Sequence, residues 1–238
     1  MGTTDTNLRF ASPVHLVNVT AFEMDVTEVT VAEYQACVDA NRCRRVDASN
    51  VTGDPPCNGA LPDHQNYPVN CVDVDDAAAY CTWVGKRVPS EEEWEYTAQR
   101  PNHRSYPWGD REPNADLLNA CGLECDASGG LGWNDGYAAT APVGSFPDGK
   151  SIDGLVDMAG NVWEWTSSRW CDYPATTCNA CSASDPSCSN PCSSCDSPSF
   201  VARGGGFTAP WFSEYRNVER GLFNASRRST GIGFRCAR

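Results

Sequence analysis

The cysteine content constrains the fold of this chain more than any other feature. The sequence has 14 cysteines in 238 residues, an even and high number for its length. Such a density is typical of disulfide frameworks in oxidising compartments, because reducing cytosol would leave the same residues as free or metal-bound thiols. We therefore expect a disulfide-rich protein that is secreted, periplasmic or held at the cell surface. The polar start, Met1 to Asp5, does not look like a signal peptide, so we expect a mature or trimmed form.

Cysteine spacing suggests partners but leaves the connectivity open. Near neighbours that are close enough to pair are Cys37 with Cys43, Cys71 with Cys81, and Cys121 with Cys125. Residues 171–199 form an insert that is rich in Ser and Cys and too poor in large apolar side chains to build a core. Its CxxC pairs, Cys178 with Cys181 and Cys192 with Cys195, favour disulfides, with a tetrahedral zinc site at 178–195 as the alternative.

Size and charge limit the classes of partner. With 238 residues and 40% hydrophobic side chains the chain can form one large domain or two small ones. The formal net charge of −13 argues against nucleic acid, since a phosphate backbone needs basic side chains. No run of about 18 apolar residues is present, so we expect no membrane span.

Three helices are predicted from their start signals. A hydroxyl or carboxyl side chain that caps the first amides, with an acid three residues later, is typical of a helix N-terminus. Such signals open helices from Thr30 to about Ala40, from Asp73 to Val84 before the terminating Gly85, and from Ser90 to near Arg100. Tyr80, Cys81 and Trp83 are expected to face inward.

Elsewhere the sequence predicts short strands and loops. Residues 13–29 alternate apolar and polar side chains, as a hairpin or two short strands would, and 69–72 could form another short strand. After Gly109 the frequent Gly and Pro residues indicate loops pinned by short strands. No nucleophile with an evident base, phosphate-binding loop or dinucleotide fingerprint is found.

The stretch from Gly154 to Thr166 combines two tryptophans, a glycine turn and two carboxylates. Trp163 and Trp165 are expected in the core. Asp157 and Glu164 stand among apolar residues, where a carboxylate needs hydrogen bonds, a cation or a metal ion.

On several separate blocks, the chain resembles the formylglycine-generating enzyme family, also called the sulfatase-modifying factor family. The clearest blocks are Gly160-Asn-Val-Trp-Glu-Trp-Thr166, Arg203-Gly-Gly205 and Gly231-Ile-Gly-Phe-Arg-Cys236, and others lie at 22–30, 85–96, 106–109 and 140–146. The resemblance covers nearly the whole chain. It implies one α+β domain over 1–238, a compact low-regularity variant of the C-type-lectin-like fold with short, mostly antiparallel strands.

Members of that family bind two calcium ions, and the resemblance implies two ligand sets here. The first is Asn119, the carbonyl of Ala120, Asp135 and the carbonyl of Tyr137; the second is Asp157, the carbonyls of Gly160 and Val162, and Glu164. Carboxylate and carbonyl oxygens are the ligands that calcium takes. A loop held by hydrogen bonds alone is the rival interpretation of each set.

The family's enzymes use copper(I) held by two cysteines to oxidise a sulfatase cysteine to formylglycine. Copper(I) is a soft ion and takes thiolates. The corresponding segment, 203–216, contains no cysteine. Ala209 stands where the first copper-binding cysteine is expected, and Glu214, by spacing, where the second is expected. The resemblance therefore argues against copper.

The resemblance leads us to the hypothesis of a catalytically silent member of that family, acting as an exported, calcium-stabilised binding module. Its ligand would meet an aromatic and polar surface formed by Trp211, Phe212, Tyr215, Arg216, Arg220, Phe223 and Asn224. The same side chains could instead only pack the end of the fold. The alternative function is a divergent copper-dependent formylglycine-generating oxidase, or another oxidase on this scaffold.

Overall fold

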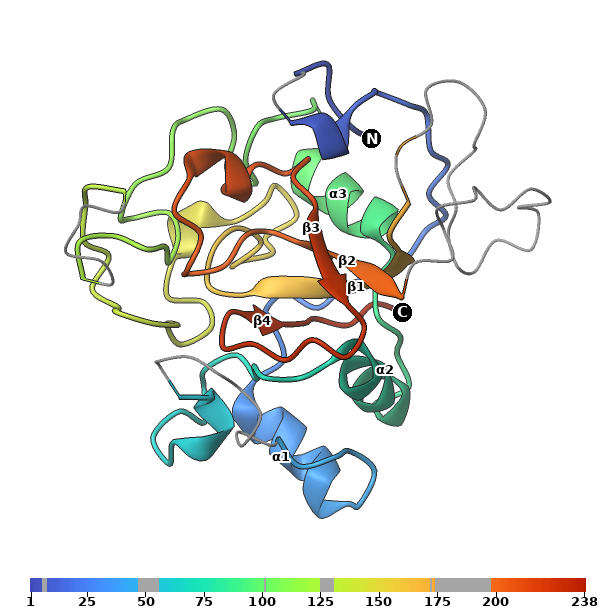
Figure 1. Ribbon diagram of the computed structural model, residues 1–238, viewed down its shortest axis with the longest axis vertical. Coiled ribbons are helices and arrows are strands. Elements are labelled where there is room, and N and C mark those ends of the chain that lie inside the picture. Colours follow the sequence, from blue (N-terminus) through green and yellow to red (C-terminus); the bar gives the residue numbers. More distant parts are fainter. Residues whose placement is uncertain (6–7, 47–55, 101, 125–130, 172, 174–197) are drawn as a thin grey trace.

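The structure is a computed structural model of residues 1–238 that describes all of them except 6–7, 47–55, 101, 125–130, 172 and 174–197. Figure 1 shows helices grouped around one small sheet, with long loops between the elements. The described residues form one compact α+β domain, as the sequence predicts.

All three predicted helices are present, at α1 (Val31–Asp39), α2 (Val74–Trp83) and α3 (Glu91–Gln99). Each opens with a capping box, because the capping side chain accepts from the third helical amide and the acid at that position returns the bond. In α1, for example, the amide of Thr30 donates to Glu33 at 2.8 Å. Gly85, at φ +75°, follows the end of α2 in the left-handed conformation that glycine favours.

The sheet has four short strands in the order β3-β2-β1-β4. They are β1 (Trp163–Arg169), β2 (Ser199–Arg203), β3 (Gly221–Asn224) and β4 (Ile232–Gly233). Pairing is antiparallel between β1 and β2 and between β2 and β3, whereas β1 and β4 run parallel. The sheet is therefore mixed, and the 3-10 turns η1 (Arg9–Ala11), η3 (Asn58–Ala60), η4 (Pro147–Gly149) and η5 (Phe212–Tyr215) interrupt the loops around it.

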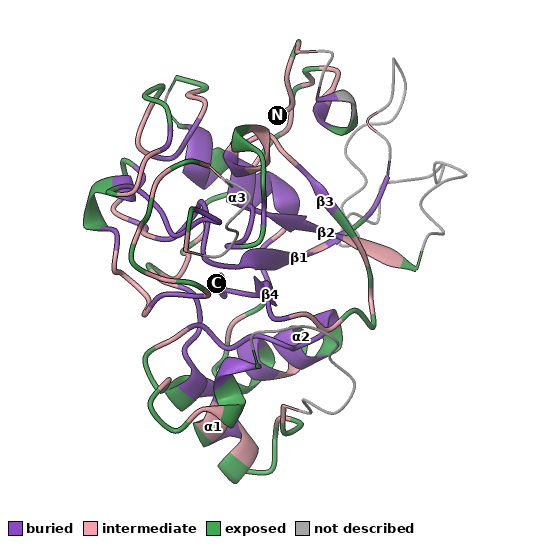
Figure 2. Cartoon of the chain, turned by 60° about the vertical axis from the view of Figure 1, so that its left-hand side comes forward, coloured by how far each residue is buried: buried purple, intermediate pink, exposed green. Residues whose placement is uncertain are grey.

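The core lies between the helices and the central strand. Figure 2 shows β1 and most of α3 as buried, while α1 alternates buried and exposed residues. Trp165 of β1 is fully buried, and its indole donates to the carbonyl of Val72 at 3.0 Å. Trp163 is also buried, so both tryptophans are core residues as predicted.

Three disulfides join described residues: Cys37–Cys43, Cys57–Cys71 and Cys81–Cys236. The first confirms a predicted pair. The pairing of Cys71 with Cys81 is wrong, because Cys81 on the buried side of α2 meets the end of the chain instead. Cys121 and Cys171 are also disulfide-bonded.

The remaining cysteine predictions fall outside the described residues. They are the pairing of Cys125, and the choice between disulfides and zinc at Cys178, Cys181, Cys192 and Cys195.

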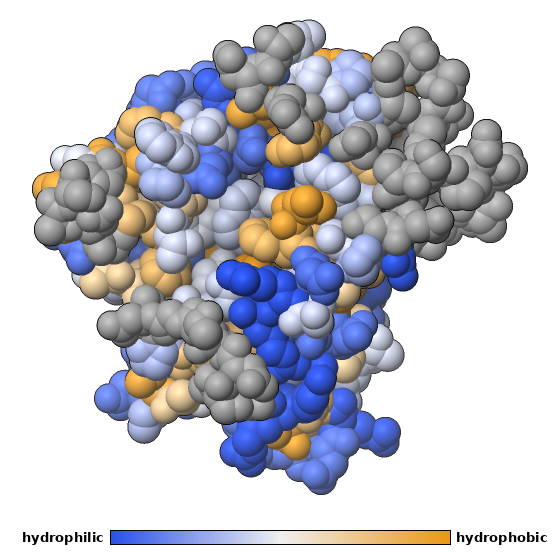
Figure 3. Space-filling model, viewed as in Figure 1, coloured by the Kyte–Doolittle hydropathy of each residue, from blue (hydrophilic) through white to orange (hydrophobic). Residues whose placement is uncertain are grey.

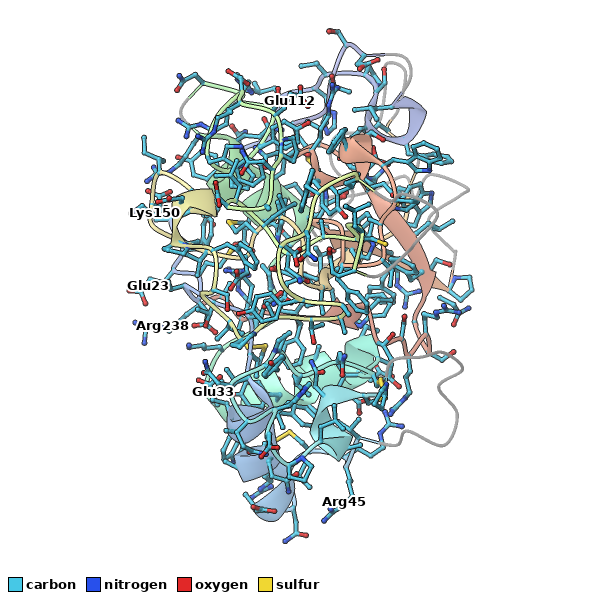
Figure 4. All side chains as sticks on the ribbon, turned by 90° about the vertical axis from the view of Figure 1, so that its left-hand side faces the viewer. Glu23, Glu33, Arg45, Glu112, Lys150 and Arg238 are labelled. Carbon is cyan, nitrogen blue, oxygen red and sulfur yellow. A yellow bond between two sulfur atoms is a disulfide. The ribbon has the colours of Figure 1, made fainter. Side chains whose placement is uncertain are left out.

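Residues 13–29 do not form the predicted hairpin. The segment pairs instead with the far end of the chain: Glu23 and Arg238 exchange two backbone hydrogen bonds of 2.8 Å, and Met24 bridges Ala237. Figure 4 shows the side chains of Glu23 and Arg238 next to each other at the edge of the molecule. The alternating pattern correctly indicated extended chain, but it could not identify a partner more than 200 residues away.

Two smaller predictions also fail. Residues 69–72 form no strand, and Trp83, at the end of α2, is 39% exposed rather than inward-facing.

Candidate functional site

A cavity of about 350 Å³ lies where β1, β3 and β4 meet the segment before η5. Trp163 of β1, Phe223 of β3 and Ile232 of β4 form apolar walls, and Ala209 and Pro210 close another side. Figure 3 shows hydrophobic surface over β3, with a broad hydrophilic area below it.

The aromatic wall depends on a glycine. The rings of Trp163 and Phe223 meet edge to face at 5.9 Å between centroids. A Cβ at Gly221 would lie 2.7 Å from the Phe223 ring and 3.0 Å from the Trp163 ring. Only glycine therefore lets the two rings come together over β3.

Two half-buried carboxylates, Glu214 and Glu219, line the same cavity. Burial raises the pKa of Glu214, and the amide of Trp211 donates to it at 3.3 Å. Burial also raises the pKa of Glu219, opposed by the charge of Arg203 and reinforced by the negative charge of Glu214. The Oε2 atom of Glu219 is buried and has no hydrogen-bond partner among the described residues.

Arg220 also lines the cavity, but its guanidinium is paired with a carboxylate beneath the cavity. Its guanidinium donates twice to Glu91, at 2.9 Å each. It lies 4.4 Å from the ring centre of Trp170 and 4.0 Å from that of Tyr173, a cation-π arrangement. The side chain is 3% exposed and therefore serves as an internal counter-ion.

Arg203, which is fully buried, holds the segment that carries Glu219. It donates to Glu95 at 2.8 Å and to the backbone carbonyls of Asn217 and Glu219 at 3.2 and 3.1 Å. α3 thus supplies Glu91 and Glu95 to balance Arg203 and Arg220. This network fixes the floor of the cavity.

The structure brings together the residues of the first predicted calcium set, which are Asn119, Ala120, Asp135 and Tyr137. Asp135 accepts from the amide of Ala120 at 2.7 Å and from that of Tyr137 at 2.9 Å. Burial raises the pKa of Asp135 to about 6. Asn119 donates its amide to the carbonyl of Ala139, while its Oδ1 is buried and has no partner within the described chain. A buried oxygen without a donor and a carboxylate without a cation fit a hard cation such as calcium.

The second predicted set comprises Asp157, Gly160, Val162 and Glu164. Both oxygens of Glu164 are engaged by Arg235 at 2.7 Å, and the indole of Trp94 adds a bond at 2.8 Å. Asp157 accepts from the amide of Gly144 at 2.6 Å, and burial raises its pKa to about 6. Because Glu164 already has a cationic partner, Asp157 and the carbonyls of Gly160 and Val162 are the better ligands for an ion here.

The two sets lie on adjoining loops. Gly160 has φ +82°, and a Cβ there would sit 2.2 Å from the carbonyl oxygen of Asn119. Within the described ranges, no three His, Cys, Asp or Glu side chains form a group that could hold a metal ion. Both sets therefore depend on backbone carbonyls, or on Asn119, to complete a cation site.

The whole chain, residues 1–238, matches the sulfatase-modifying factor enzyme 1-like domain. The chain belongs to the formylglycine-generating enzyme family.

Relatives in the family differ in their described activity. A formylglycine-generating enzyme of Mycobacterium tuberculosis is 36% identical over 191 residues, covering 74% of this chain and 58% of that protein. An inactive C-alpha-formylglycine-generating enzyme 2 of Bos taurus is 42% identical over 106 residues, covering 44% of this chain and 34% of that protein. Since the chain spans only part of each, membership does not by itself assign an activity.

A solved structure of PvdO from Pseudomonas aeruginosa shares the fold. It has a TM-score of 0.75 and 27% identity, covering all of this chain and 88% of that one. The low-regularity α+β domain is thus the fold of the formylglycine-generating enzyme family.

Ala209 and Glu214, which stand at the family's copper positions by spacing, both line the cavity. Ala209 is buried, and its carbonyl accepts the hydroxyl of Tyr215 at 2.6 Å. No described cysteine lines the cavity. By the correspondence expected from the sequence, an apolar methyl group and a carboxylate would stand in place of the two thiols.

The seven side chains predicted as a ligand surface divide into three groups by exposure. Trp211, at 69% exposure, Phe212 and Asn224 are exposed, while Arg216 and Phe223 are half-buried. Tyr215 and Arg220 are buried, although Arg220 still lines the cavity. Tyr215 packs under Ala209, and Arg220 is neutralised by Glu91.

Sequence reasoning missed Trp163 as a cavity wall, because a tryptophan among core residues gives no sign that one edge lines a cavity. It also missed that Glu214 and Glu219 are half-buried at the cavity, with raised pKa values. The available signal was the number of charged residues near the copper positions, where Glu214 and Glu219 stand beside several arginines. The partners of those arginines could not be identified from the sequence.

Proposed function

We propose that this domain is a catalytically silent member of the formylglycine-generating enzyme family that acts as a binding module. The observation that carries the proposal is the cavity at the copper positions, which is open and has Ala209 and Glu214 in its lining. Copper(I) takes soft thiolates, and a carboxylate is a hard ligand. The site therefore lacks the chemistry for copper(I) but keeps a space for a ligand.

The family relationship is consistent with this proposal. The bovine relative is described by its name as inactive, so loss of activity is known among homologues of this chain. A cavity with an aromatic wall and a few polar groups is typical of small-molecule sites.

Calcium would act as a structural ion in this proposal. The first ligand set offers a carboxylate from Asp135, the oxygen of Asn119 that lacks a donor, and two backbone carbonyls. Calcium bound there would hold the loop of 119–120 against that of 135–137, and it would offset the burial of the carboxylate.

Export is supported by cysteine chemistry. All eight described cysteines take part in disulfides, and disulfides persist in oxidising compartments. The helices of the described chain include none long and apolar enough to cross a membrane.

The test is an assay for formylglycine formation. The protein is incubated with copper(I), oxygen and a Cys-x-Pro-x-Arg peptide, and aldehyde is sought by mass spectrometry beside an active family enzyme. We expect unchanged peptide. Conversion would overturn the silent function in favour of a divergent oxidase that draws a thiol from elsewhere.

A different oxidase on this scaffold is the second candidate. The raised pKa values of Glu214 and Glu219 favour it, because a carboxylic acid poised nearer neutrality can exchange protons with a substrate. Oxygen consumption in the presence of a bound ligand would support that candidate over a binding module.

A further inference from the structure

The charges around the cavity do not balance. Arg220 and Arg203 are the buried cations beneath it, and both are paired with Glu91 or Glu95 of α3. Arg227 lines the cavity and is exposed, and Arg216 pairs with Asp5 at 3.1 Å. Glu214 and Glu219 therefore bring more negative charge to the cavity lining than Arg227 offsets.

The position of Glu219 makes this imbalance costly. Its Oε2 is buried without a hydrogen-bond partner among the described residues. The guanidinium of Arg203 donates to the backbone carbonyl of Glu219 and partly offsets the charge of its carboxylate. A buried carboxylate oxygen without a donor loses hydration that nothing replaces. Because this atom has almost no solvent-accessible surface, a cation in the cavity would act on the charge of Glu219 without touching Oε2.

The cavity also has apolar walls, beside the polar side chains of Thr208, Arg227 and Ser229. Trp163 and Phe223 supply ring surfaces, and Ile232 and Pro210 add aliphatic contact. Aromatic faces attract cations and pack against planar apolar groups. A ligand that combines a positive charge with an apolar body is complementary to both features.

A bare metal ion fits less well than an organic cation. The cavity lining has two carboxylates, and within the described ranges no third His, Cys, Asp or Glu completes a metal-binding group with them. A metal ion would also leave the apolar walls and most of the 350 Å³ without contact. A protonated amine needs only one or two carboxylate acceptors.

We propose that the cavity binds an organic cation, with its ammonium group at Glu214 and Glu219 and its apolar body against Trp163 and Phe223. This inference rests on the proposed function, because it requires a cavity free of copper. Arg227 is exposed at the same cavity and would weaken the binding of any cation by repulsion.

The test compares two probes that differ mainly in charge, 2-phenylethylamine and its neutral analogue 2-phenylethanol. Binding to the intact oxidised protein is followed by NMR through the indole N–H of Trp163. We expect the amine to bind about tenfold more tightly than the alcohol, as a charge-assisted bond exceeds a neutral one by about that factor. Equal affinities, or no shift of Trp163 with the amine, would overturn the inference.

Variants then separate the carboxylates from general effects. Glu219→Gln and Glu214→Gln keep the side-chain shape and should each reduce amine binding several-fold while leaving alcohol binding unchanged. Arg227→Gln, the matched control in the same cavity, should raise amine affinity. An amine preference that survives both glutamine substitutions would place the amine elsewhere and overturn the inference.

The two proposals fail separately. Loss of the amine preference leaves the binding-module function standing with another class of ligand. Aldehyde formation in the copper assay removes the binding-module function whether or not the amine binds.

Discussion

Arg235 and Glu164 form a two-pronged ion pair in which neither side chain is exposed to solvent. Nε and Nη2 of Arg235 each lie 2.7 Å from an oxygen of Glu164. The same guanidinium donates to the backbone carbonyls of Asp25, Val26 and Val156. The pair therefore joins β1, the closing segment of the chain and the loop at 25–26.

Replacing Arg235 by Met should destabilise the fold by about 3–5 kcal/mol, because it leaves the Glu164 charge buried and uncompensated. Chemical denaturation measures the change in unfolding free energy. The double variant Arg235→Met, Glu164→Gln should lose less stability than the two single variants lose in sum, because the unpaired charge is then absent. Arg238→Met, at an exposed pair with Glu23, is the control and should change stability by no more than about 1 kcal/mol. Equal losses in Arg235→Met and Arg238→Met would contradict this account.

The Cys81–Cys236 disulfide should contribute more stability than Cys37–Cys43. It closes a loop of 155 residues rather than 6, and chain entropy assigns such loops about 5 and about 2 kcal/mol. Paired Cys→Ala variants of each bridge, compared by denaturant melts, test the order. A larger loss from the short bridge would show that the long loop is already constrained in the unfolded chain.

Calcium should raise the melting temperature, and a strong chelator should lower it. An ion that binds only the folded state at about 100 times its Kd adds about 2.7 kcal/mol. Asp135→Asn removes a ligand charge from the first set and should reduce the calcium-dependent shift. Asp148→Asn, at an exposed position of η4, is the control and should keep it. If the melting temperature is the same in calcium and chelator, the structural-ion proposal is wrong.

Binding of 2-phenylethylamine should weaken as the pH falls. The midpoint of this loss should lie at a higher pH than a glutamate with an ordinary pKa would give. Burial raises the pKa of both Glu214 and Glu219 above 4.5, so they take up protons earlier and lose the charge that attracts the amine. The amine itself stays protonated throughout this range. Titrating affinity against pH by NMR measures the midpoint. A midpoint at or below 4.5 would mean that these carboxylates do not hold the ligand.

Local features of the fold were predictable, and long-range ones were not. The capping boxes at Thr30 and Ser90 involve residues three positions apart, so the pattern alone located the helices. The partner of Cys81 lies 155 residues away, and that of Glu164 lies 71 residues away. Pairings at such distances are decided by packing of the whole chain.

The candidate site divides in the same way. Spacing predicts that Ala209 and Glu214 stand at the copper positions, and the structure places both residues in the lining of one cavity. The burial of Arg220 could not be predicted, because its partner Glu91 comes from a helix 129 residues earlier. Without that pairing, the negative charge left in the cavity could not be recognised.

The most direct test of the central claim is a copper(I) titration against a coloured copper(I) chelator, with the oxidised wild-type protein beside the double variant Ala209→Cys, Glu214→Cys. We predict that the wild type leaves copper(I) with the chelator and that the double variant, with two thiols at the cavity, removes about one equivalent. Removal of one equivalent by the wild type, as tightly as by the double variant, would contradict the claim that this cavity has lost its copper site.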